Sequence, residues 1–417
     1  MSSFNPLFLA NLQRRPSGLL VPPSALTWEP EITTTQTSGT YYYINRNFKY
    51  LGADPNKGAI TNTGNGTARH ICIGCRFWTN SHAVKSLAAA GFEFYGCRSQ
   101  GINPNVYGQP MGCFFEGTAN WFIAENNHVE YMGGMRLVGA DADYVRIRYN
   151  RALNIIGSKS NGTGLAGWAG FIPEPHNPEN VNNQTYAKFM SLAQFNSMTL
   201  GANGAGAGTG GISRSEIGWN ESVSYPGQSR NSDHISFFAS GGVPGGNVLV
   251  HHNFLQGMWR QDYLDATHSG RGIQNELTGS KSWYKDIEDN TIVGIPGAIE
   301  IHGENSYINV RRNKAFYSRA VGGQTLPTIQ QPYTGEGTGI NQVWEDNAFT
   351  WYTPGYIPET QFVTNPGNTG NSAGSNWSET SPCSEALEAA QLAIWRAQAS
   401  AALASLGKSI GNSIPAW

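Results

Sequence analysis

Charged residues are scarce in this 417-residue chain. Only 13% of the residues are Asp, Glu, Lys or Arg, which is about half the share usual in soluble proteins. The 27 basic and 29 acidic residues nearly cancel and leave a formal net charge of −2. Because a nucleic-acid-binding protein needs excess positive charge to neutralise phosphates, the composition argues against DNA or RNA as a partner.

Long apolar runs are also missing. None approaches the ~20 residues that a membrane-spanning helix needs, so no membrane partner is expected. The short apolar stretch Leu7–Leu9 is followed by Arg14 and Arg15 and has no basic residue before it, which is unlike a secretory signal. The sequence therefore predicts a protein made without this export route.

The cysteines do not show the even number and regular spacing of a disulfide-bonded protein. The five cysteines are odd in number and scattered: Cys72, Cys75, Cys97, Cys113 and Cys383. A disulfide framework is therefore not expected. Cys72 and Cys75 have the CxxC spacing of redox and zinc sites, but residues three apart in a strand point to opposite faces. We expect no metal and no cofactor, with Cys75 and Cys97 in the core.

The chain does contain much glycine, 51 residues, and a repeated segment. Each copy runs from an aromatic or apolar residue through Ile or Val to an asparagine, and a further apolar position follows. The asparagines are Asn127, Asn150, Asn220, Asn253, Asn290, Asn313 and Asn347. Cys75 and Cys97 take the same place in the earliest copies.

The spacing of these positions is that of a solenoid. It is 22 residues from Cys75 to Cys97 and 23 from Asn127 to Asn150. Most other intervals are 30 to 37 residues, but 70 residues separate Asn150 from Asn220. A base period of about 22 residues with additions is typical of stacked coils that carry loops of variable length. The long interval holds about three coils, or fewer with a large insertion.

Alternation within each coil is typical of strands. Four segments align on a final glycine: Cys113–Gly117, Met135–Gly139, Asn275–Gly279 and Ile299–Gly303. Two positions before it stand Phe115, Leu137, Leu277 and Ile301, an apolar set that must face the core. The recurring asparagine fits an inward turn, where its amide can bond to the asparagine of the next coil about 4.8 Å away.

These asparagine-bearing coils resemble those of the pectate-lyase-like right-handed parallel β-helix superfamily, which includes pectinases, alginate epimerases and phage tailspikes. The resemblance covers residues 41–352 and implies an all-β solenoid. It does not extend to a catalytic signature. The chain has neither a pectinase-type Asn-x-Asp with a following Asp-Asp pair nor an epimerase-type Asp-Pro-His.

The two ends of the chain do not follow the repeat. Residues 1–40 are expected to cap the first coil or to form an attachment arm. Residues 353–382 are rich in Pro, Gly, Asn and Ser and are expected to form a linker or surface loop.

The C-terminal segment, residues 383–417, is expected to contain a helix. Ser384 is a good N-cap and Gly407 a good stop. Leu387, Ile394 and Ala401 stand seven residues apart. This spacing permits self-association, which would make the helix an oligomerisation element. The alternative is a helix packed along one end of the solenoid.

Candidate catalytic residues come from the outward positions beside the core strand. Glu276 and Glu300 occupy equivalent places in the glycine alignment. On neighbouring coils their carboxylates would lie about one strand spacing apart, close to the roughly 5–5.5 Å of retaining glycosidases. Like charges at that distance raise one of the two pKa values, which suits a general acid.

Further candidates surround this pair, because Asp233 and His234 begin the preceding strand and an insertion at 259–268 would wall the same groove. The candidate catalytic residues are Glu276, Glu300, Asp233, Asp262 and Asp265. The candidate substrate-binding residues are Arg136, His302, Glu116, His234, Trp259, Arg260 and His268. The alternative is a face whose polar residues stack for solubility, with each Glu offset by a nearby Arg or His.

The aromatic residues also divide into candidates for ligand binding and candidates for a structural role. Trp219 and Trp259 are candidates for lining a sugar groove. Tyr144 and Tyr307 stand at the aromatic position of the repeat, which favours a structural role for both.

Three functions fit these features. The first is a phage tailspike or tail-fibre-like virion protein that binds a bacterial surface polysaccharide as its receptor, with or without depolymerising it. By resemblance it would be a homotrimer, attached to other virion proteins through residues 1–40. The second is a secreted bacterial polysaccharide lyase or glycoside hydrolase. The third is a non-enzymatic structural or decoration protein of a virion. The low charge, the N-terminal arm and the terminal helix favour the first.

Overall fold

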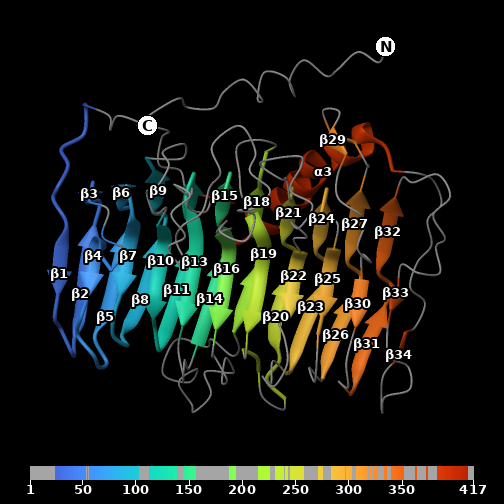
Figure 1. The fold of residues 1–417 in the computed structure, drawn as a ribbon, viewed down its shortest axis with the longest axis horizontal. Helices are drawn as coiled ribbons and strands as arrows, with labels where there is room; N and C mark the ends of the chain where they lie inside the picture. The colour runs from blue at the N-terminus through green and yellow to red at the C-terminus, as the bar shows by residue number, and fades with distance from the viewer. Residues whose placement is uncertain are drawn as a thin grey trace, which may run out of the picture.

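The computed structural model describes residues 24–52, 54, 56–102, 112–138, 144–155, 187–193, 215–225, 231–238, 240–242, 245–257, 271–275, 283–295, 297–302, 307–317, 320–321, 324–325, 333–335, 340–351, 362–363, 372–373 and 383–411. Within this part of the chain the protein is mostly β, and its strands form three stacked parallel sheets (Figure 1). The chain visits the sheets in turn, so from β1 to β27 every third strand returns to the same sheet. This arrangement is compatible with the predicted parallel β-helix.

Sheet I contains β1 (Ile32–Thr34), β4 (Gly58–Asn62), β7 (His82–Ser86), β10 (Cys113–Thr118), β13 (Gly133–Val138), β16 (Ala187–Ala193), β19 (Asn231–Phe238), β22 (Arg271–Asn275), β25 (Gly297–Ile301), β30 (Tyr333–Gly335) and β33 (Phe362–Val363). Sheet II contains β2 (Thr40–Ile44), β5 (Arg69–Ile73), β8 (Gly91–Tyr95), β11 (Trp121–Glu125), β14 (Tyr144–Arg148), β17 (Glu216–Gly218), β20 (Val248–His251), β23 (Lys285–Glu288), β26 (Ile308–Arg311), β31 (Gln342–Glu345) and β34 (Ser372–Ala373).

Sheet III contains β3 (Asn47–Tyr50), β6 (Arg76–Thr79), β9 (Arg98–Gly101), β12 (His128–Glu130), β15 (Arg151–Leu153), β18 (Glu221–Val223), β21 (Phe254–Gln256), β24 (Thr291–Val293), β27 (Lys314–Tyr317) and β32 (Ala348–Trp351). A short antiparallel pair, β28 (Ala320–Val321) and β29 (Gln324–Thr325), lies outside these sheets. Strands β1, β33 and β34 extend sheets I and II into the segments predicted as a cap and a linker.

The joint between sheets II and III always has two residues, from β2–β3 to β31–β32. The first adopts the left-handed conformation, as at Tyr149 (φ 60°) and Trp219 (φ 56°). In the first coil the second residue is Arg46, and in every later coil it is the recurring cysteine or asparagine. This sharp turn directs its side chain into the core, where Asn150, Asn220 and Asn253 are all fully buried.

The asparagines form a continuous ladder. The Asn150 amide donates to Asn220 Oδ1 and the Asn220 amide donates to Asn253 Oδ1, each at 2.9 Å. The ladder runs on to Asn347, and at its other end Asn127 Oδ1 accepts the Cys97 backbone N–H at 2.8 Å. The predicted stacking of inward asparagines is therefore confirmed, with Cys97 buried in the same row.

The 70-residue interval contains one coil. Asn150 bonds directly to Asn220, and only β16 of sheet I lies between β15 and β17. The remaining residues are additions on either side of β16, at 154–186 and 194–215. Of the two possibilities left open by the spacing, the one with a large insertion is the observed one.

The core side of sheet I is an unbroken apolar row whose members are 0–1% exposed: Val84, Phe115, Met135, Met190, Ile235, Ile273 and Ile299. Full burial of such side chains contributes roughly 1.5–3 kcal/mol each. The register differs from the predicted glycine alignment, because Phe115 pairs with Met135 and not with Leu137. Gly117 lies inside β10, where an added Cβ would stand 1.9 Å from the Ser86 carbonyl oxygen, so it does not mark the end of the strand.

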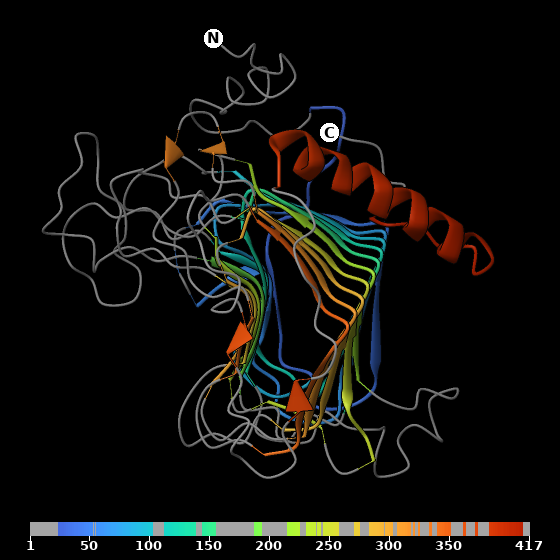
Figure 2. The same cartoon turned by 90° about the vertical axis from the view of Figure 1, so that its right-hand side faces the viewer.

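Helix α3 (Glu385–Ala404) begins at Ser384, whose hydroxyl accepts the Leu387 N–H at 3.2 Å, and Gly407 (φ 62°) follows its end. It lies along the outer face of sheet III and not at one end of the stack (Figure 2). Trp395 and Ala399 are buried there against an apolar cluster that includes Phe254.

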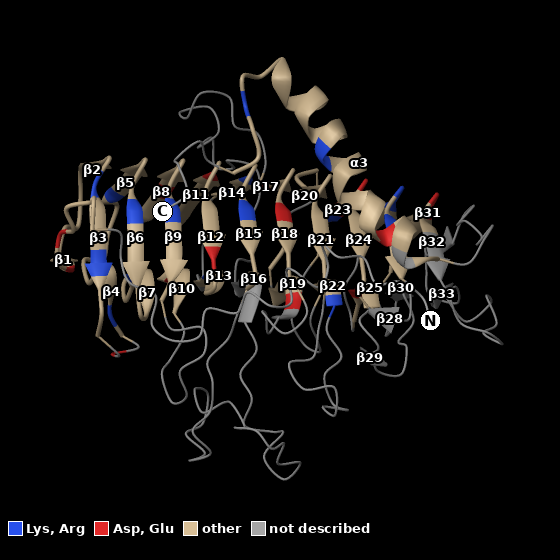
Figure 3. Ribbon diagram, turned by 90° about the horizontal axis from the view of Figure 1, so that it is seen from above, with Lys and Arg blue, Asp and Glu red and all other residues tan. Residues whose placement is uncertain are grey.

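Polar bonds tie the same helix to the sheet. The Trp395 indole N–H donates to the His252 carbonyl oxygen at 2.9 Å, and Arg396 pairs with Glu221 at 2.6 Å. Arg151 pairs with the same carboxylate at 3.0 Å, and Figure 3 shows this change of charge between β15 and β18. Ile394, one of the residues spaced seven apart, stays 48% exposed. No helix among the described residues is long and apolar enough to cross a membrane.

Candidate functional site

The two joints that flank sheet I vary in length, unlike the joint between sheets II and III. Before β16 the connection spans 154–186, and before β22 it spans 257–270. After β16 it spans 194–215, and after β22 it spans 276–284. The outer face of sheet I is therefore bordered on both sides by inserted chain, and most heavily in the middle coils.

A row of outward positions runs along this face. Its register partners are Lys85, Glu116, Arg136, Ser191, Ser236, Gln274, Glu300 and Thr334. Arg136 and Glu300 thus share one row, as the sequence predicted. Glu116 belongs to it as well and not to the row of His302, because the glycine alignment was displaced by two residues at β10. Charged groups gather at two places, around Glu116 and around Glu300.

Glu300 is held by an arginine and a histidine side chain. Its carboxylate forms an ion pair with the Arg271 guanidinium, and His302 Nε2 lies 2.6 Å from Oε1. Gly297 is the register partner of Arg271, and a Cβ on it would stand 2.5 Å from Arg271 Cδ. Because Gly297 has no side chain, the Arg271 side chain can pass over it and reach Glu300.

Asp233 joins the same cluster from β19. The Arg271 backbone N–H donates to its Oδ1 at 3.1 Å. With the Gln274 amide turned so that its NH₂ group faces β19, that group lies 3.2 Å from both Asp233 oxygens. Strand β22 thus bridges two carboxylates that lie two coils apart. Asp233 and Glu300 are each 6% exposed, which is little for outward-facing side chains.

The expected stack of Glu276 on Glu300 is not the arrangement that the register gives. Gln274 is the partner of Glu300. The general-acid role predicted for Glu300 rested on a carboxylate as its partner, and the register partner is an uncharged amide. Glu276 itself lies outside the described residues, as do Asp262, Asp265, Trp259, Arg260 and His268.

The His234 side chain points inward. The prediction that it contacts a ligand on the outer face is therefore wrong. Its ring is fully buried, with Nδ1 2.9 Å from Ser222 Oγ and Nε2 3.0 Å from the Gly257 carbonyl oxygen. Burial lowers the pKa of His234 to about 4, so the ring is neutral at pH 7. Asp233 and His234 are adjacent in the chain and project to opposite sides of sheet I.

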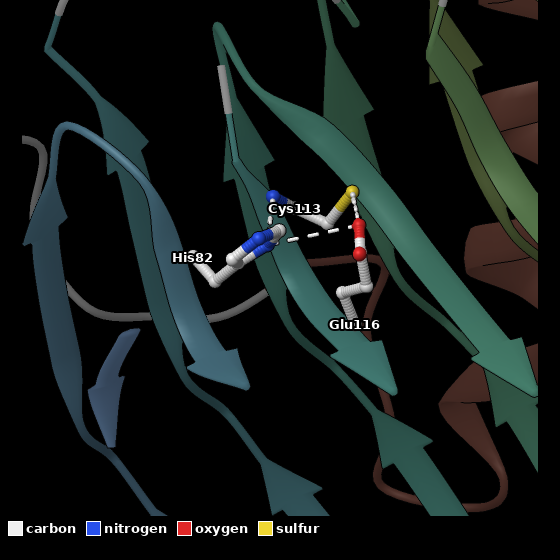
Figure 4. A group of neighbouring side chains, drawn as sticks. All are labelled: His82, Cys113 and Glu116. Carbon is white, nitrogen blue, oxygen red and sulfur yellow. Dashed lines mark hydrogen bonds and ion pairs between the residues drawn. The ribbon is translucent and has the colours of Figure 1, made fainter. Parts of the chain in front are cut away.

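Glu116 lies beside His82 and Cys113 (Figure 4), and it too is held by cationic side chains. Lys85 Nζ lies 2.8 Å from its Oε1, and Arg136 and His82 lie at 3.7 and 3.9 Å. Burial alone would raise the pKa of Glu116, but the nearby His82, Lys85 and Arg136 more than offset this and hold the pKa below its usual value. Glu116 is 7% exposed and its acceptor capacity is largely used within the protein.

His82, Cys113 and Glu116 lie close enough to hold a metal ion, with donor atoms within 4.8 Å of one another. The surrounding chemistry does not suit a cation. Lys85 already occupies one Glu116 oxygen, and His82 Nδ1 accepts the Cys113 backbone N–H at 3.0 Å. Burial also raises the pKa of the Cys113 thiol, so the thiolate that a metal needs is disfavoured. The contacts of this group join strands β7 and β10.

Sequence reasoning missed Arg271 and Gln274, although they contribute most of the bridging contacts. Alternation from the core residue Ile273 places Gln274 outward, but it does not single out Arg271, which stands two residues before Ile273. The alignment on Gly279 began at Asn275 and therefore passed over the strand that carries them.

Comparison with known proteins does not assign this site. No family model, no curated protein and no solved structure matches the chain. The function has to be argued from the geometry of the described residues.

Proposed function

We propose that this chain is a tailspike-like protein that binds a bacterial surface polysaccharide through the outer face of sheet I. The observation that carries the proposal is the cluster of Asp233, Arg271, Gln274, Glu300 and His302. It lies on the one face of the solenoid whose two borders carry the inserted chain.

The chemistry of the cluster suits sugar hydroxyls. A hydroxyl both donates and accepts, so carboxylate acceptors beside guanidinium and amide donors satisfy both needs. The ion pairs hold these groups in place before a ligand arrives, which lowers the entropy cost of binding. The Arg271 and His302 side chains keep 12% and 16% exposure, so a ligand on this face can reach them.

Binding is the role that this geometry favours over cleavage. Both carboxylates are committed to neighbours, Glu300 to Arg271 and His302, and Asp233 to β22. A depolymerase would use Asp233 and Glu300 as its acid and base, and product analysis tests that version. Both versions assign the same residues to the same ligand.

The remaining features of the proposal concern the assembly. We infer right-handed coils, because crossover connections between parallel strands have that hand in about 98% of cases. Ile394 on α3 stays exposed and is open to self-association, and the resemblance to tailspikes suggests a homotrimer. Residues 1–40 would attach it to other proteins of a virion tail.

The test measures binding to an array of purified bacterial capsular and O-antigen polysaccharides by affinity electrophoresis. We expect Glu300→Gln and Asp233→Asn to weaken binding about tenfold or more, since hydrogen bonds to charged groups contribute ~1.5–3 kcal/mol. Glu288→Gln is the matched control, because Glu288 pairs with Arg312 at 2.8 Å on sheet II, away from this face.

Product analysis accompanies the binding assay. New reducing ends alone indicate hydrolysis, and absorbance from unsaturated uronates indicates a lyase. The proposal fails if the wild-type protein retains no polysaccharide of the array, or if the control weakens binding as much as the site variants do.

A further inference from the structure

Three aromatic residues gather where sheet I gives way to sheet II. Tyr284 and Tyr307 directly precede β23 and β26, and their rings stack with centroids 4.7 Å apart and planes 10° apart. Trp283 meets both rings nearly edge-on, at 6.3 Å from Tyr284 and 5.9 Å from Tyr307. All three side chains are partly exposed.

The backbone conformation at these two positions does not favour tyrosine. Tyr284 (φ 56°) and Tyr307 (φ 59°) both adopt the left-handed conformation, which favours Gly or Asn. The next coil has Asn341 at the equivalent place, with φ 54°. Because asparagine serves this turn without strain, the choice of tyrosine twice in succession points to a use for the rings.

An earlier pair in the same row of sheet II shows what a purely structural stack looks like. Trp121 and Tyr144 pair in register, with ring centroids 4.8 Å apart. Tyr144 is 1% exposed, the Arg69 guanidinium lies 5.1 Å from the Trp121 ring centroid, and Arg146 lies over Tyr144. The sequence favoured a structural role for Tyr144, and this burial agrees with it.

Tyr307 differs from Tyr144 in its surroundings. Within the described part of the chain, no Lys or Arg side chain lies over the rings of Tyr284 or Tyr307. Among the described residues, the two tyrosine rings contact each other and Trp283. The two tyrosines therefore form a stacked, partly exposed aromatic pair with no Lys or Arg of the described residues over their rings.

The aromatic group belongs to the same coils as the polar cluster. Trp283 and Tyr284 follow β22, which carries Arg271 and Gln274. Tyr307 follows β25 in the coil that carries Glu300 and His302. A ligand that crosses sheet I at the polar cluster and leaves toward sheet II would meet these rings next.

We propose that Trp283, Tyr284 and Tyr307 form a stacking platform for a pyranose ring of the bound polysaccharide. The C–H groups on one face of a pyranose pack against aromatic rings, so the ring faces carry the contact. This inference rests on the proposed function and adds to it a ligand class: a pyranose-containing glycan with one ring face free of charged substituents.

The decisive variant is Tyr307→Asn. It copies the residue that the next coil uses at this turn, so the backbone conformation is preserved while the ring is lost. The probe is the polysaccharide of the capsular and O-antigen array that the wild-type protein retains. We expect about tenfold weaker binding for Tyr307→Asn, since aromatic contacts of this kind contribute on that order. Tyr307→Phe keeps the ring and should bind within about twofold of wild type.

Two controls distinguish a loss of the aromatic platform from damage to the polar cluster and from unfolding. Tyr144→Phe, at the covered pair, should leave binding unchanged, and thermal unfolding checks that each variant is folded. If Tyr307→Asn and Trp283→Leu both bind like wild type while Glu300→Gln is weakened, the platform is wrong and the proposed function stands. If the wild-type protein binds no glycan of the array, the proposed function is overturned and the platform with it.

Discussion

The corner between sheets II and III and the corners beside sheet I follow opposite rules. The former has two residues in every coil and, in every coil after the first, directs a cysteine or an asparagine into the core. The latter range from two residues, at β12–β13, to the 33 residues of 154–186. The ladder fixes the distance between coils at one corner. Because the entropy of closing a loop grows only slowly with its length, the other corners can accept additions.

A second contrast lies within the outward row of sheet I. Glu116 has Lys85, Arg136 and His82 around it in coils joined by short or moderate connections. Glu300 and Asp233 are bridged by β22 in the coils next to the longest insertions. Similar charged residues thus serve strand pairing in one region and a candidate binding site in the other.

The largest expected effect comes from breaking the ladder. Asn253 donates to Asn290 Oδ1 at 2.9 Å and to the Ile217 carbonyl oxygen at 3.0 Å, and it accepts from Asn220. Asn253→Ala leaves several buried groups without partners, at ~1–3 kcal/mol each, so we expect a loss of about 4 kcal/mol in the free energy of unfolding. Urea denaturation measures it. Asn309→Ala is the control, since Asn309 bonds only to Asp286 on the outer surface. Equal losses for both variants would contradict a special role for the ladder.

The next largest effect is a pH dependence of stability that arises at the corner between sheets III and I. The corner between sheets III and I holds a titratable inward group, His234, with a pKa of about 4 in the folded protein. The unfolded chain binds the proton more readily between pH 6.5 and pH 4, so stability falls as the pH is lowered through this window. The full effect is about 3 kcal/mol. His234→Gln should flatten the corresponding part of a pH series of unfolding midpoints. A slope that survives in the variant would assign this pH dependence to other groups.

The smallest effect concerns the path of Arg271. Gly297→Ala places a methyl group against Arg271 Cδ, so we expect about 1 kcal/mol of lost stability and weaker polysaccharide binding. The double variant Gly297→Ala with Arg271→Ala tests the cause. If the clash with Arg271 is responsible, the glycine change adds little in the Arg271→Ala background. Additive effects would mean that Gly297 acts elsewhere.

The register of sheet I could not be read from the sequence, for a specific reason. Alternation has a period of two, so a shift by two residues keeps every side chain on its face and leaves the pattern unchanged. The choice of Gly117 as a strand end shifted Phe115 from Met135 to Leu137, and both partners are apolar. The pattern identified the faces of the strands but not the pairs across them.

The sequence by itself determined the features that depend on neighbours along the chain. The coil period, the inward asparagines, the Ser384 cap and the Gly407 stop all follow from local backbone geometry. The tertiary structure decided which side chains meet across coils. It joined Arg271 to Glu300, put Gln274 where Glu276 was expected, and laid α3 on sheet III through Arg396 and Glu221, which are 175 residues apart. These contacts depend on how many residues each insertion adds, and no local pattern records where a coil returns.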